Sequence, residues 1–540
     1  MPDAVVIGSG PNGLVAANQL ADAGWSVQVL EAQPEPGGAV RSSDALTLPG
    51  FVHDRFSSFY PLAVASPAIS ALRLEEHGLR WRRAPYAVAH PRRDGSAAWI
   101  SSSLDETCAH LETMGAGDGE VWRALMGRWA TVGPELLRAF FTPFPPVRAG
   151  ARMARALGGY RELLDFARFG MLPVRRFADE ELRGDGAARL LSGNALHADF
   201  NPEQPGSAMF GWVLCGLAQQ AGYPVPEGGS GALTQAMVRR LRSLGGTVTC
   251  NARVDKVEVR GGRAVGVRLE GGETVSAGRA VLADVGAPQL YLDLLDRAHV
   301  PPAVIRALDR FEYGFATFKI DLALDGPIPW LNDDMAKAGT VHVAEGLDAL
   351  TRATTEIVLR QVPGEPFLVA GQYAAADPTR MPAGKEVFWA YTHVPRRVEG
   401  DAGPDGLTGD WADARERETF ADRMVAQIET VAPGVTGKIL ARHVTTPADF
   451  EAQNANLVGS DLNGGTAQLH QELVFRPIPG LGRPETPVAG LYLASASAYP
   501  SGGVHGACGA NAARAALHSP KPVQRALARA TARLAGKPDA

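Results

Sequence analysis

The chain has little cysteine, and its cysteines are not clustered. Among 540 residues there are four, Cys108, Cys215, Cys250 and Cys508, and no two of them form a CxxC pair. This scatter argues against a disulfide framework, a cysteine-based zinc site and a dithiol redox centre. We therefore expect no metal site and a reducing compartment.

Neither sign of charge is in large excess. The chain has 53 basic and 58 acidic residues, which gives a net charge of -5 at pH 7. No global positive field is present to attract DNA or RNA, so we expect no nucleic acid partner.

Long apolar runs are also missing. No uninterrupted stretch approaches the ~20 residues that a membrane-spanning helix needs. The N-terminus, MPDAVVIGSG, has no basic segment before its short apolar run, which indicates a β-strand rather than a signal peptide. We expect a cytoplasmic protein of about two to four domains, with peripheral contact to a membrane as an alternative.

The first segment has a strand, a glycine turn and a helix in succession. Apolar residues 4–7 lead into GSGPNG, and LVAANQL follows with helical character. In such a GxGxxG motif the three glycines allow a tight turn, a close approach to a pyrophosphate and close packing of helix on strand. The phosphates then lie at the amides of the helix N-terminus. The predicted contacts in this segment are Gly8, Gly10, Pro11, Asn12 and Gly13.

A predicted second strand, residues 25–30, ends in an acidic residue. Glu31 follows the last glycine of the motif by 31 − 13 = 18 positions, where a carboxylate accepts hydrogen bonds from a ribose diol. Such a carboxylate repels a 2′-phosphate, which disfavours NADP. Next come Ala32 and the pair Gly37 and Gly38, which allow close backbone approach, and Arg41, which can bind a phosphate.

With these residues the sequence resembles the flavin amine oxidase and phytoene desaturase superfamily. Its members follow the glycine motif and the ribose acid with GG-x-x-R[ST] at the FAD pyrophosphate, and GGAVRS in this chain matches that pattern. Within the superfamily the chain is most similar to the phytoene dehydrogenase-related proteins, including the group called pyridine nucleotide-disulfide oxidoreductase domain 2. The resemblance implies FAD as the cofactor.

Two further segments extend the resemblance to about residue 517. Near the C-terminus, GLYLA followed by SASAYPSGGVHGACGANAA again predicts strand, glycine turn and helix. In phytoene desaturase-like proteins the stretch equivalent to Gly502, Gly503 and Val504 lies against the isoalloxazine. In the middle of the chain, the resemblance implies that the Val254 position supplies backbone contacts to adenine and that the Ala283 strand rejoins the FAD sheet.

The predicted fold class is α/β, with a discontinuous Rossmann-like FAD-binding domain, an inserted mixed-sheet substrate domain and a helical subdomain. Residues 317–324 and 386–391 are predicted strands of the substrate domain. A tail in which Arg525, Arg529 and Arg533 recur every four residues predicts a short basic amphipathic helix. The expected boundaries are 1–75, 226–290 and 485–517 for the FAD-binding domain, 76–225 for a largely helical insert, 291–484 for the substrate-binding domain and 518–540 for the tail.

The candidate catalytic residue is His505, which lies inside the C-terminal glycine loop. A histidine there can move a proton near neutral pH, and the alternative is that it hydrogen-bonds local backbone and shapes the turn. His197 and Asp199 are candidates for the cavity wall, but a structural role is favoured for them. Cys508 is expected to pack beside the loop.

Residues 138–176 are rich in arginine, with aromatic residues between the arginines. A solvated helix face or a contact between subunits of a homo-oligomer is the favoured interpretation. The alternative is a basic amphipathic patch that docks on an anionic membrane and admits a lipid-like substrate.

We expect an FAD-dependent dehydrogenase or desaturase that takes hydride from a hydrophobic small molecule, with an isoprenoid or polyene as the implied class. Residues 228–231 follow Pro226 rather than a strand, so no second dinucleotide motif is present and a diffusible acceptor, oxygen or a quinone, is expected to reoxidise the flavin. One alternative is an amine oxidase-like enzyme with Tyr499 in an aromatic cage, and another is a non-catalytic protein stabilised by FAD.

Overall fold

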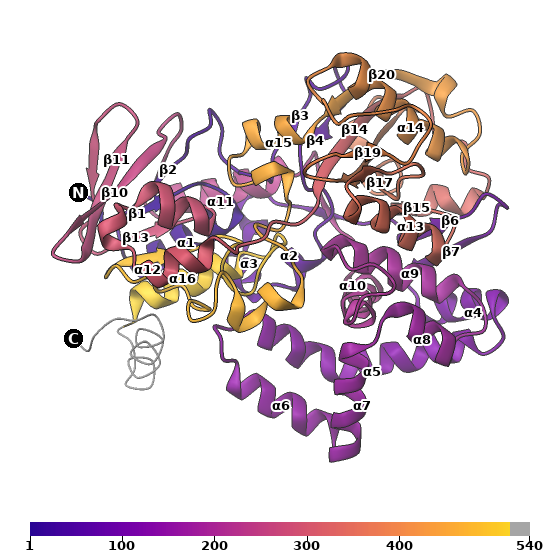
Figure 1. The fold of residues 1–540 in the computed structure, drawn as a ribbon, viewed down its shortest axis with the longest axis horizontal. Coiled ribbons are helices and arrows are strands. Elements are labelled where there is room, and N and C mark those ends of the chain that lie inside the picture. Colours follow the sequence, from indigo (N-terminus) through magenta and orange to yellow (C-terminus); the bar gives the residue numbers. More distant parts are fainter. Residues whose placement is uncertain (519–540) are drawn as a thin grey trace.

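The computed structural model describes residues 1–518. Figure 1 shows a sheet that contains β1 and β13 at the left, a second sheet that contains β14 and β17 at the upper right, and the helices α4–α10 below it. The predicted basic helix of the tail lies outside the described residues.

The first sheet unites three distant parts of the chain. Its five strands lie in the order β21-β13-β1-β2-β9, and all four pairings are parallel. Helix α1 packs beside it, against both the C-terminal helix α16 and helix α11. The bounds are β1 Ala4–Ile7, α1 Pro11–Asp22, β2 Val27–Leu30, α11 Gly231–Ser243, β9 Thr247–Thr249, β13 Ala280–Ala283, β21 Leu491–Leu493 and α16 Ala507–Leu517.

A small antiparallel sheet is inserted between β9 and β13. It consists of β10 (Val254–Arg260), β11 (Arg263–Leu269) and β12 (Thr274–Ser276). The turn between the first two strands is made by Gly261 and Gly262, both of which have positive φ.

The second sheet has seven strands in the order β20-β14-β18-β17-β15-β6-β7. The predicted strands at 317–324 and 386–391 are confirmed and pair with each other in antiparallel register. All nine residues of β14 are buried, as expected for an inner strand covered on both faces. The bounds are β6 Tyr86–Pro91, β7 Ala97–Ser101, β14 Ala316–Leu324, β15 Ala338–Val343, β17 Leu368–Gln372, β18 Glu386–Val394 and β20 Ile439–Thr445.

Two strands of this sheet come from the segment expected to be largely helical. Strand β6 pairs in parallel with β15, and β7 pairs with β6. All residues of both strands are buried. The helical part of the insert therefore begins only at Leu104.

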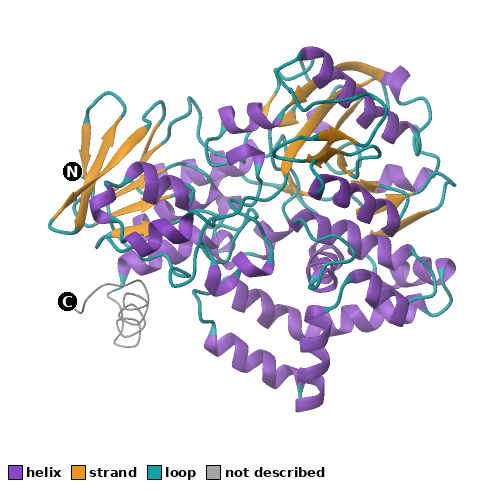
Figure 2. Cartoon of the chain, viewed as in Figure 1, coloured by secondary structure: helices purple, strands orange, loops and turns teal. Residues whose placement is uncertain are grey.

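The helices of the insert lie beneath the large sheet, where Figure 2 shows them gathered in purple. The pair α6 and α7 extends farthest from the sheets (Figure 1). The bounds are α4 Leu104–Met114, α5 Asp118–Phe140, α6 Val147–Leu157, α7 Tyr160–Met171, α8 Val174–Glu181, α9 Gly186–Ala195 and α10 Ser207–Ala221.

The structure also contains further helices and strands. They are β3 Ser42–Ser43, β4 His53–Asp54, α2 Pro61–Ala65, α3 Pro67–Ser70, β5 Trp81–Arg82, β8 Val225–Pro226, α12 Pro302–Leu308, α13 Leu347–Val358, β16 Gln361–Val362, β19 Gly400–Asp401, α14 Ala414–Glu429 and α15 Pro447–Gln453.

Candidate flavin and substrate site

A cavity of about 830 Å³ lies where the two sheets and the helical insert meet. Its wall includes the N-terminal glycine turn, the loop at 495–504, one face of the seven-stranded sheet and side chains of α5 and α10. One continuous space therefore joins the predicted cofactor segments to the predicted substrate domain.

The N-terminal glycine turn permits very close contacts. Gly8 has φ +88° and donates its N–H to the carbonyl of Leu30 at 2.8 Å. A Cβ on Gly13 would lie 2.3 Å from the carbonyl oxygen of Gly8, and one on Gly10 would lie 2.7 Å from Oδ2 of Asp284. No larger residue fits these positions without movement of the backbone or of Asp284.

Glu31 lies in the cavity wall together with Ala32. Its Oε2 accepts hydrogen bonds from the N–H and the hydroxyl of Ser9 at 2.9 and 2.6 Å, and its Oε1 accepts from the N–H of Gln33 at 2.9 Å. The carboxylate is thus fixed at the end of β2, the place predicted for a ribose contact.

Arg41 is not among the residues that line the cavity. Its Nε donates to the carbonyl of Gly38 and its Nη2 to the carbonyl of Gln453, and the guanidinium lies over the ring of Phe56. In the structure this side chain holds the loop that carries Gly38, which does line the cavity, and it makes no contact in the cavity itself. Gly37, Gly13 and Ala283 likewise lie behind the wall.

The C-terminal loop supplies Gly502, Gly503 and Val504 to the wall. Gly503 has φ +104°, and a Cβ on Gly502 would lie 2.6 Å from Oδ1 of Asn463. Val254, at the start of β10, lines the opposite end of the cavity, near Glu31.

His505 lies behind this loop and is fully buried. Its Nδ1 accepts a hydrogen bond from the N–H of Ala507 at 3.0 Å, and its ring packs against Phe140 and Phe141. Burial lowers the pKa of His505 to about 4, so the ring is neutral at physiological pH. These contacts match the alternative in which the histidine shapes the turn. The buried Cys508 thiol donates to the carbonyl of Ala498, within the same packed loop.

Sequence reasoning missed Asp284, which lines the cavity directly after β13. Its Oδ2 accepts a hydrogen bond from the N–H of Gly13 at 2.8 Å. Burial raises the pKa of Asp284 to about 7, and the nearby Glu31 adds to the effect. Ligands of open α/β sheets bind outside the carboxyl ends of the strands, and that rule was the available signal.

At the substrate end of the cavity, the side formed by the helical insert is apolar and the side formed by the seven-stranded sheet is partly polar. The side chains from α5 and α10 are all apolar: Leu136, Leu137, Phe140, Met209, Phe210, Val213 and Leu214. The sheet contributes Thr317, Lys319, Thr340, Val369, Trp389 and Tyr391.

Lys319 is the charged residue that the sheet contributes to the cavity wall, and its charge is paired with a buried carboxylate. Its Nζ lies 2.5 Å from both carboxylate oxygens of Asp321 and donates to the carbonyl of Asp54 at 2.9 Å. Behind it, Arg380 pairs with Asp54 at 2.6 Å and with Asp377 at 3.0 Å, all fully buried. This network fixes the floor of the cavity and offers no free charge to a ligand.

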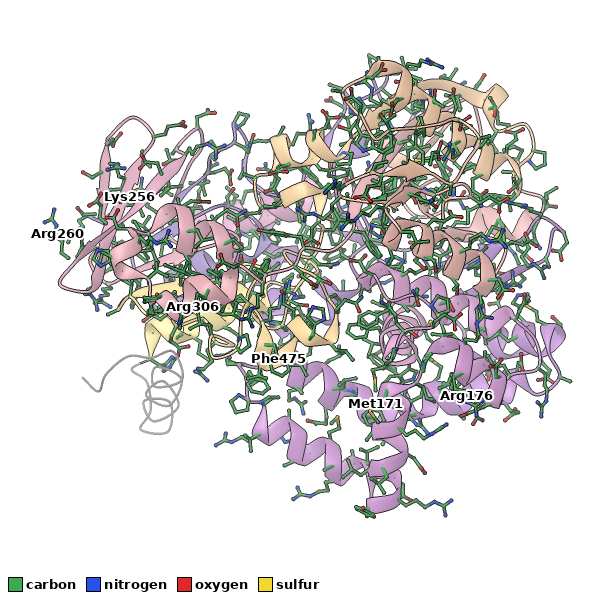
Figure 3. All side chains as sticks on the ribbon, in the orientation of Figure 1. Met171, Arg176, Lys256, Arg260, Arg306 and Phe475 are labelled. Carbon is green, nitrogen blue, oxygen red and sulfur yellow. The ribbon has the colours of Figure 1, made fainter. Side chains whose placement is uncertain are left out.

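Five of the eight arginines in residues 138–176 form ion pairs. Arg168 and Arg176 both contact Glu180, and Arg175 contacts Glu203 and Asp348. Figure 3 shows Met171 and Arg176 on the helical insert, away from the first sheet.

No helix within residues 1–518 combines the length and hydropathy needed to cross a membrane. In the same range, no group of three or more His, Cys, Asp or Glu residues is arranged to hold a metal ion.

The model of the family described as flavin containing amine oxidoreductase matches residues 12–517. The chain belongs to this family. The match confirms the relationship expected from the glycine motifs, and FAD is the cofactor that members of this flavin-containing family bind. The chain is therefore a flavoprotein oxidoreductase.

Several known proteins are similar to this flavoprotein over nearly its full length. The rat protein named pyridine nucleotide-disulfide oxidoreductase domain-containing protein 2 is 28% identical over 556 residues, which cover 95% of this chain and 92% of that protein. The lycopene-forming phytoene desaturase of Pseudescherichia vulneris is 26% identical over 535 residues, with 96% and 99% covered. A solved oxidoreductase structure from Methanosarcina mazei superposes with a TM-score of 0.58 at 16% identity, covering 96% of this chain and all of that one. The expected α/β flavoprotein fold is confirmed.

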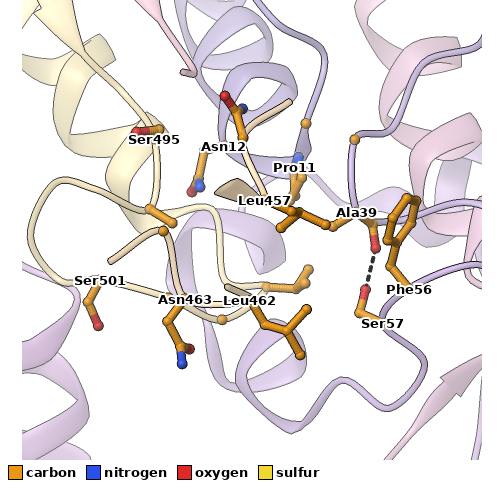
Figure 4. Close-up of a pocket in the computed structure, with 18 of the residues that line it drawn as sticks. Pro11, Asn12, Ala39, Phe56, Ser57, Leu457, Leu462, Asn463, Ser495 and Ser501 are labelled. Atoms are coloured by element: carbon orange, nitrogen blue, oxygen red, sulfur yellow. Dashed lines mark hydrogen bonds between the residues drawn. The ribbon is translucent and has the colours of Figure 1, made fainter. Parts of the chain in front are cut away.

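The cavity residues of this flavoprotein fit FAD. Asn12 is 5% exposed, lines the cavity, and its buried Oδ1 has no hydrogen-bond partner in the described residues. Figure 4 shows Pro11 and Asn12 above the segment that carries Leu457, Leu462 and Asn463. An unpaired buried amide oxygen is costly, and a hydroxyl group of a bound ligand would satisfy it.

Proposed function

We propose that this flavoprotein is an FAD-dependent dehydrogenase or desaturase acting on a hydrophobic, isoprenoid or polyene, substrate. The observation that carries the proposal is the apolar wall from α5 and α10, which lines the same cavity as the loop at Gly502–Val504. The cavity of about 830 Å³ lies toward the upper end of the roughly 300–1,000 Å³ of typical small-molecule pockets, and the flavin and the substrate share it.

The protein's own residues bind, orient and exclude water in this mechanism. Bound FAD supplies a hydride acceptor. Phe140, Met209 and Val213 hold an apolar chain against the loop that carries Gly503 and exclude water from it. Burial lowers the pKa of His197 and His505 to about 4 and that of His342 well below its ordinary value, so none of these three rings is charged near neutral pH in this mechanism.

The proposal is tested by anaerobic mixing of the FAD-loaded protein with isoprenoid polyenes in detergent. Bleaching of the oxidised flavin bands by a polyene, and not by amines, supports it. Bleaching by amines alone would overturn it in favour of the second candidate.

The second candidate, an amine oxidase-like enzyme, has one observation in its favour. Trp389 and Tyr391 both line the cavity and stack in parallel, with ring centroids 6.0 Å apart and an interplanar angle of 6°. Tyr499, the residue expected in an aromatic cage, does not line the cavity and donates its hydroxyl to the carbonyl of Ala139 at 2.9 Å.

We also propose that a diffusible acceptor, oxygen or a quinone, reoxidises the flavin. The sequence offers no second dinucleotide motif to bind NAD. Rates of reoxidation by air and by a soluble quinone, measured after photoreduction, distinguish the two acceptors.

A peripheral membrane contact is the route that we propose for a lipid-like substrate. Leu469 and Leu473 line the cavity and are 46% and 52% exposed, and Phe475 beside them is 44% exposed. The cavity wall therefore reaches an apolar outer surface, where Figure 3 labels Phe475. Sedimentation with anionic phospholipid vesicles should be lost in Leu473→Ser. Self-association without vesicle binding would assign this surface to a homo-oligomer instead.

A further inference from the structure

The cavity contains a group of neutral hydrogen-bonding side chains that the proposed hydride transfer does not use. His197 lines the cavity, and its Nε2 lies 2.8 Å from Nε2 of His342. His342 is fully buried in β15. The two histidines are 145 positions apart in the sequence and form one hydrogen-bonded pair in the wall.

Three hydroxyl groups lie on the same face of the sheet as His342 and line the same cavity. Thr340 precedes His342 by two residues on β15, so both side chains point to one face. Val369 is paired with both His342 and Tyr391, which places Tyr391 on the same face, two strands away. Thr317 joins them from β14.

Two of these hydroxyls have no partner in the protein. Thr317 and Thr340 are 1% and 2% exposed, both line the cavity, and neither Oγ1 makes a hydrogen bond in the described part of the chain. A buried hydroxyl without a partner costs about 1–3 kcal/mol. A polar atom of a ligand in the cavity could form the hydrogen bonds that these hydroxyls lack.

The surroundings of His342 determine which nitrogen of His197 carries the proton. The Nδ1 of His342 is buried without a partner, and it packs so closely on helix α9 that a Cβ on Gly193 would lie 2.2 Å from it. Buried N–H groups without a partner are rarer than unpaired acceptors, so the proton of His342 belongs on Nε2. His342 then donates to Nε2 of His197, and His197 keeps its proton on Nδ1 as a donor.

The charge at this end of the cavity excludes an ionic ligand group. Burial lowers the pKa of His197 to about 4 and that of His342 well below its ordinary value. Burial also raises the pKa of Tyr391, so its phenol is neutral. Lys319, the cation of this sheet face, is paired with Asp321. A carboxylate or ammonium group would be buried there without a counter-ion, which is expensive.

We infer that His197, oriented by His342, forms with Thr340 and Tyr391 a neutral subsite for an uncharged oxygen of the substrate, a hydroxyl or a carbonyl. The substrate is then an oxygenated apolar molecule rather than a pure hydrocarbon. This inference rests on the proposed function and specifies its substrate class. His197 is a binding residue and His342 a positioning residue.

The test compares two ligands of one skeleton, phytol and the corresponding hydrocarbon phytene, through the change that each causes in the visible spectrum of the FAD-loaded protein. Phytol should bind roughly three- to tenfold more tightly, the ratio expected from one neutral hydrogen bond. His197→Phe should reduce this ratio to about one and leave phytene binding intact.

His342 is tested through rescue by a conservative variant. His342→Gln retains a donor for Nε2 of His197 and should keep part of the preference for phytol, whereas His342→Leu should lose it. Met209→Ala, in the apolar wall, is the matched control and should weaken both ligands by the same factor. If the histidine pair had only a structural role, the His342 variants would weaken the binding of phytene and phytol by the same factor.

Equal binding of phytol and phytene by the unaltered protein would overturn the inference and leave the proposed function standing. If neither ligand changes the spectrum while amines do, the proposed function and the inference both fail.

Discussion

Replacing Gly509 with alanine should push the C-terminal helix away from the N-terminal glycine turn. A Cβ on Gly509 of α16 would lie 1.9 Å from the carbonyl oxygen of Asn12. Ordinary contacts of this kind begin at 3.4 Å, so one backbone must move by 3.4 − 1.9 = 1.5 Å. Overpacking of this kind costs about 1–3 kcal/mol. Because Asn12 lines the cavity, we expect this cost to lower the affinity for FAD.

The assay is titration of the apoprotein with FAD, followed by quenching of flavin fluorescence. A loss of 1–3 kcal/mol corresponds to a roughly 5- to 150-fold increase in Kd. The matched control is Gly127→Ala on α5, where a Cβ meets nothing within 4 Å. That exposed helical position should gain up to about 1 kcal/mol in unfolding free energy and keep FAD binding. If Gly509→Ala binds FAD as tightly as the control, the close packing of α16 on the glycine turn is wrong.

Three further predictions concern single side chains. The Asp284 carboxyl is neutral below its pKa of about 7 and ionised above it, so the affinity for FAD should fall as the pH rises from 6 to 8. Asp284→Asn should remove this pH dependence in calorimetric titrations. An affinity of the unaltered protein that does not change with pH would refute this prediction. His505→Leu removes the acceptor for the N–H of Ala507 and should lower the unfolding free energy by about 1–3 kcal/mol. His505→Asn should keep most of the unfolding free energy of the unaltered protein. Loss of turnover in a stable, FAD-loaded His505→Asn variant would instead indicate a catalytic role. Arg380→Met leaves Asp54 buried without its partner and should cost about 3–5 kcal/mol in urea unfolding, a value near zero being the contrary result.

The two strand, turn and helix units of the cofactor half could be predicted because each is local in the sequence, whereas the joining of β1, β13 and β21 into one sheet spans long distances and was expected only from the family resemblance. The short strand at 4–7, the glycine turn and the helix that begins at Pro11 are consecutive in the sequence and adjacent in space. The C-terminal strand and helix at 491–517 follow the same order, joined by a longer loop that contains Gly502 and Gly503.

The sheet at the substrate end could be predicted only in part, because its pairings span long distances. Strand β6 pairs with β15, about 250 residues later, and nothing in the sequence of residues 86–91 indicates that partner. The same limit applies to His197, which follows helix α9 and whose partner His342 lies on β15, 145 positions later. The phosphate contact expected of Arg41 stays a prediction; in the structure the side chain donates to the carbonyls of Gly38 and Gln453.

The most direct test of the account is the visible absorption spectrum of the purified protein, followed by acid denaturation and chromatography of the released cofactor. We expect the bands of an oxidised flavin and release of FAD. A colourless protein that also fails to take up added FAD would contradict it.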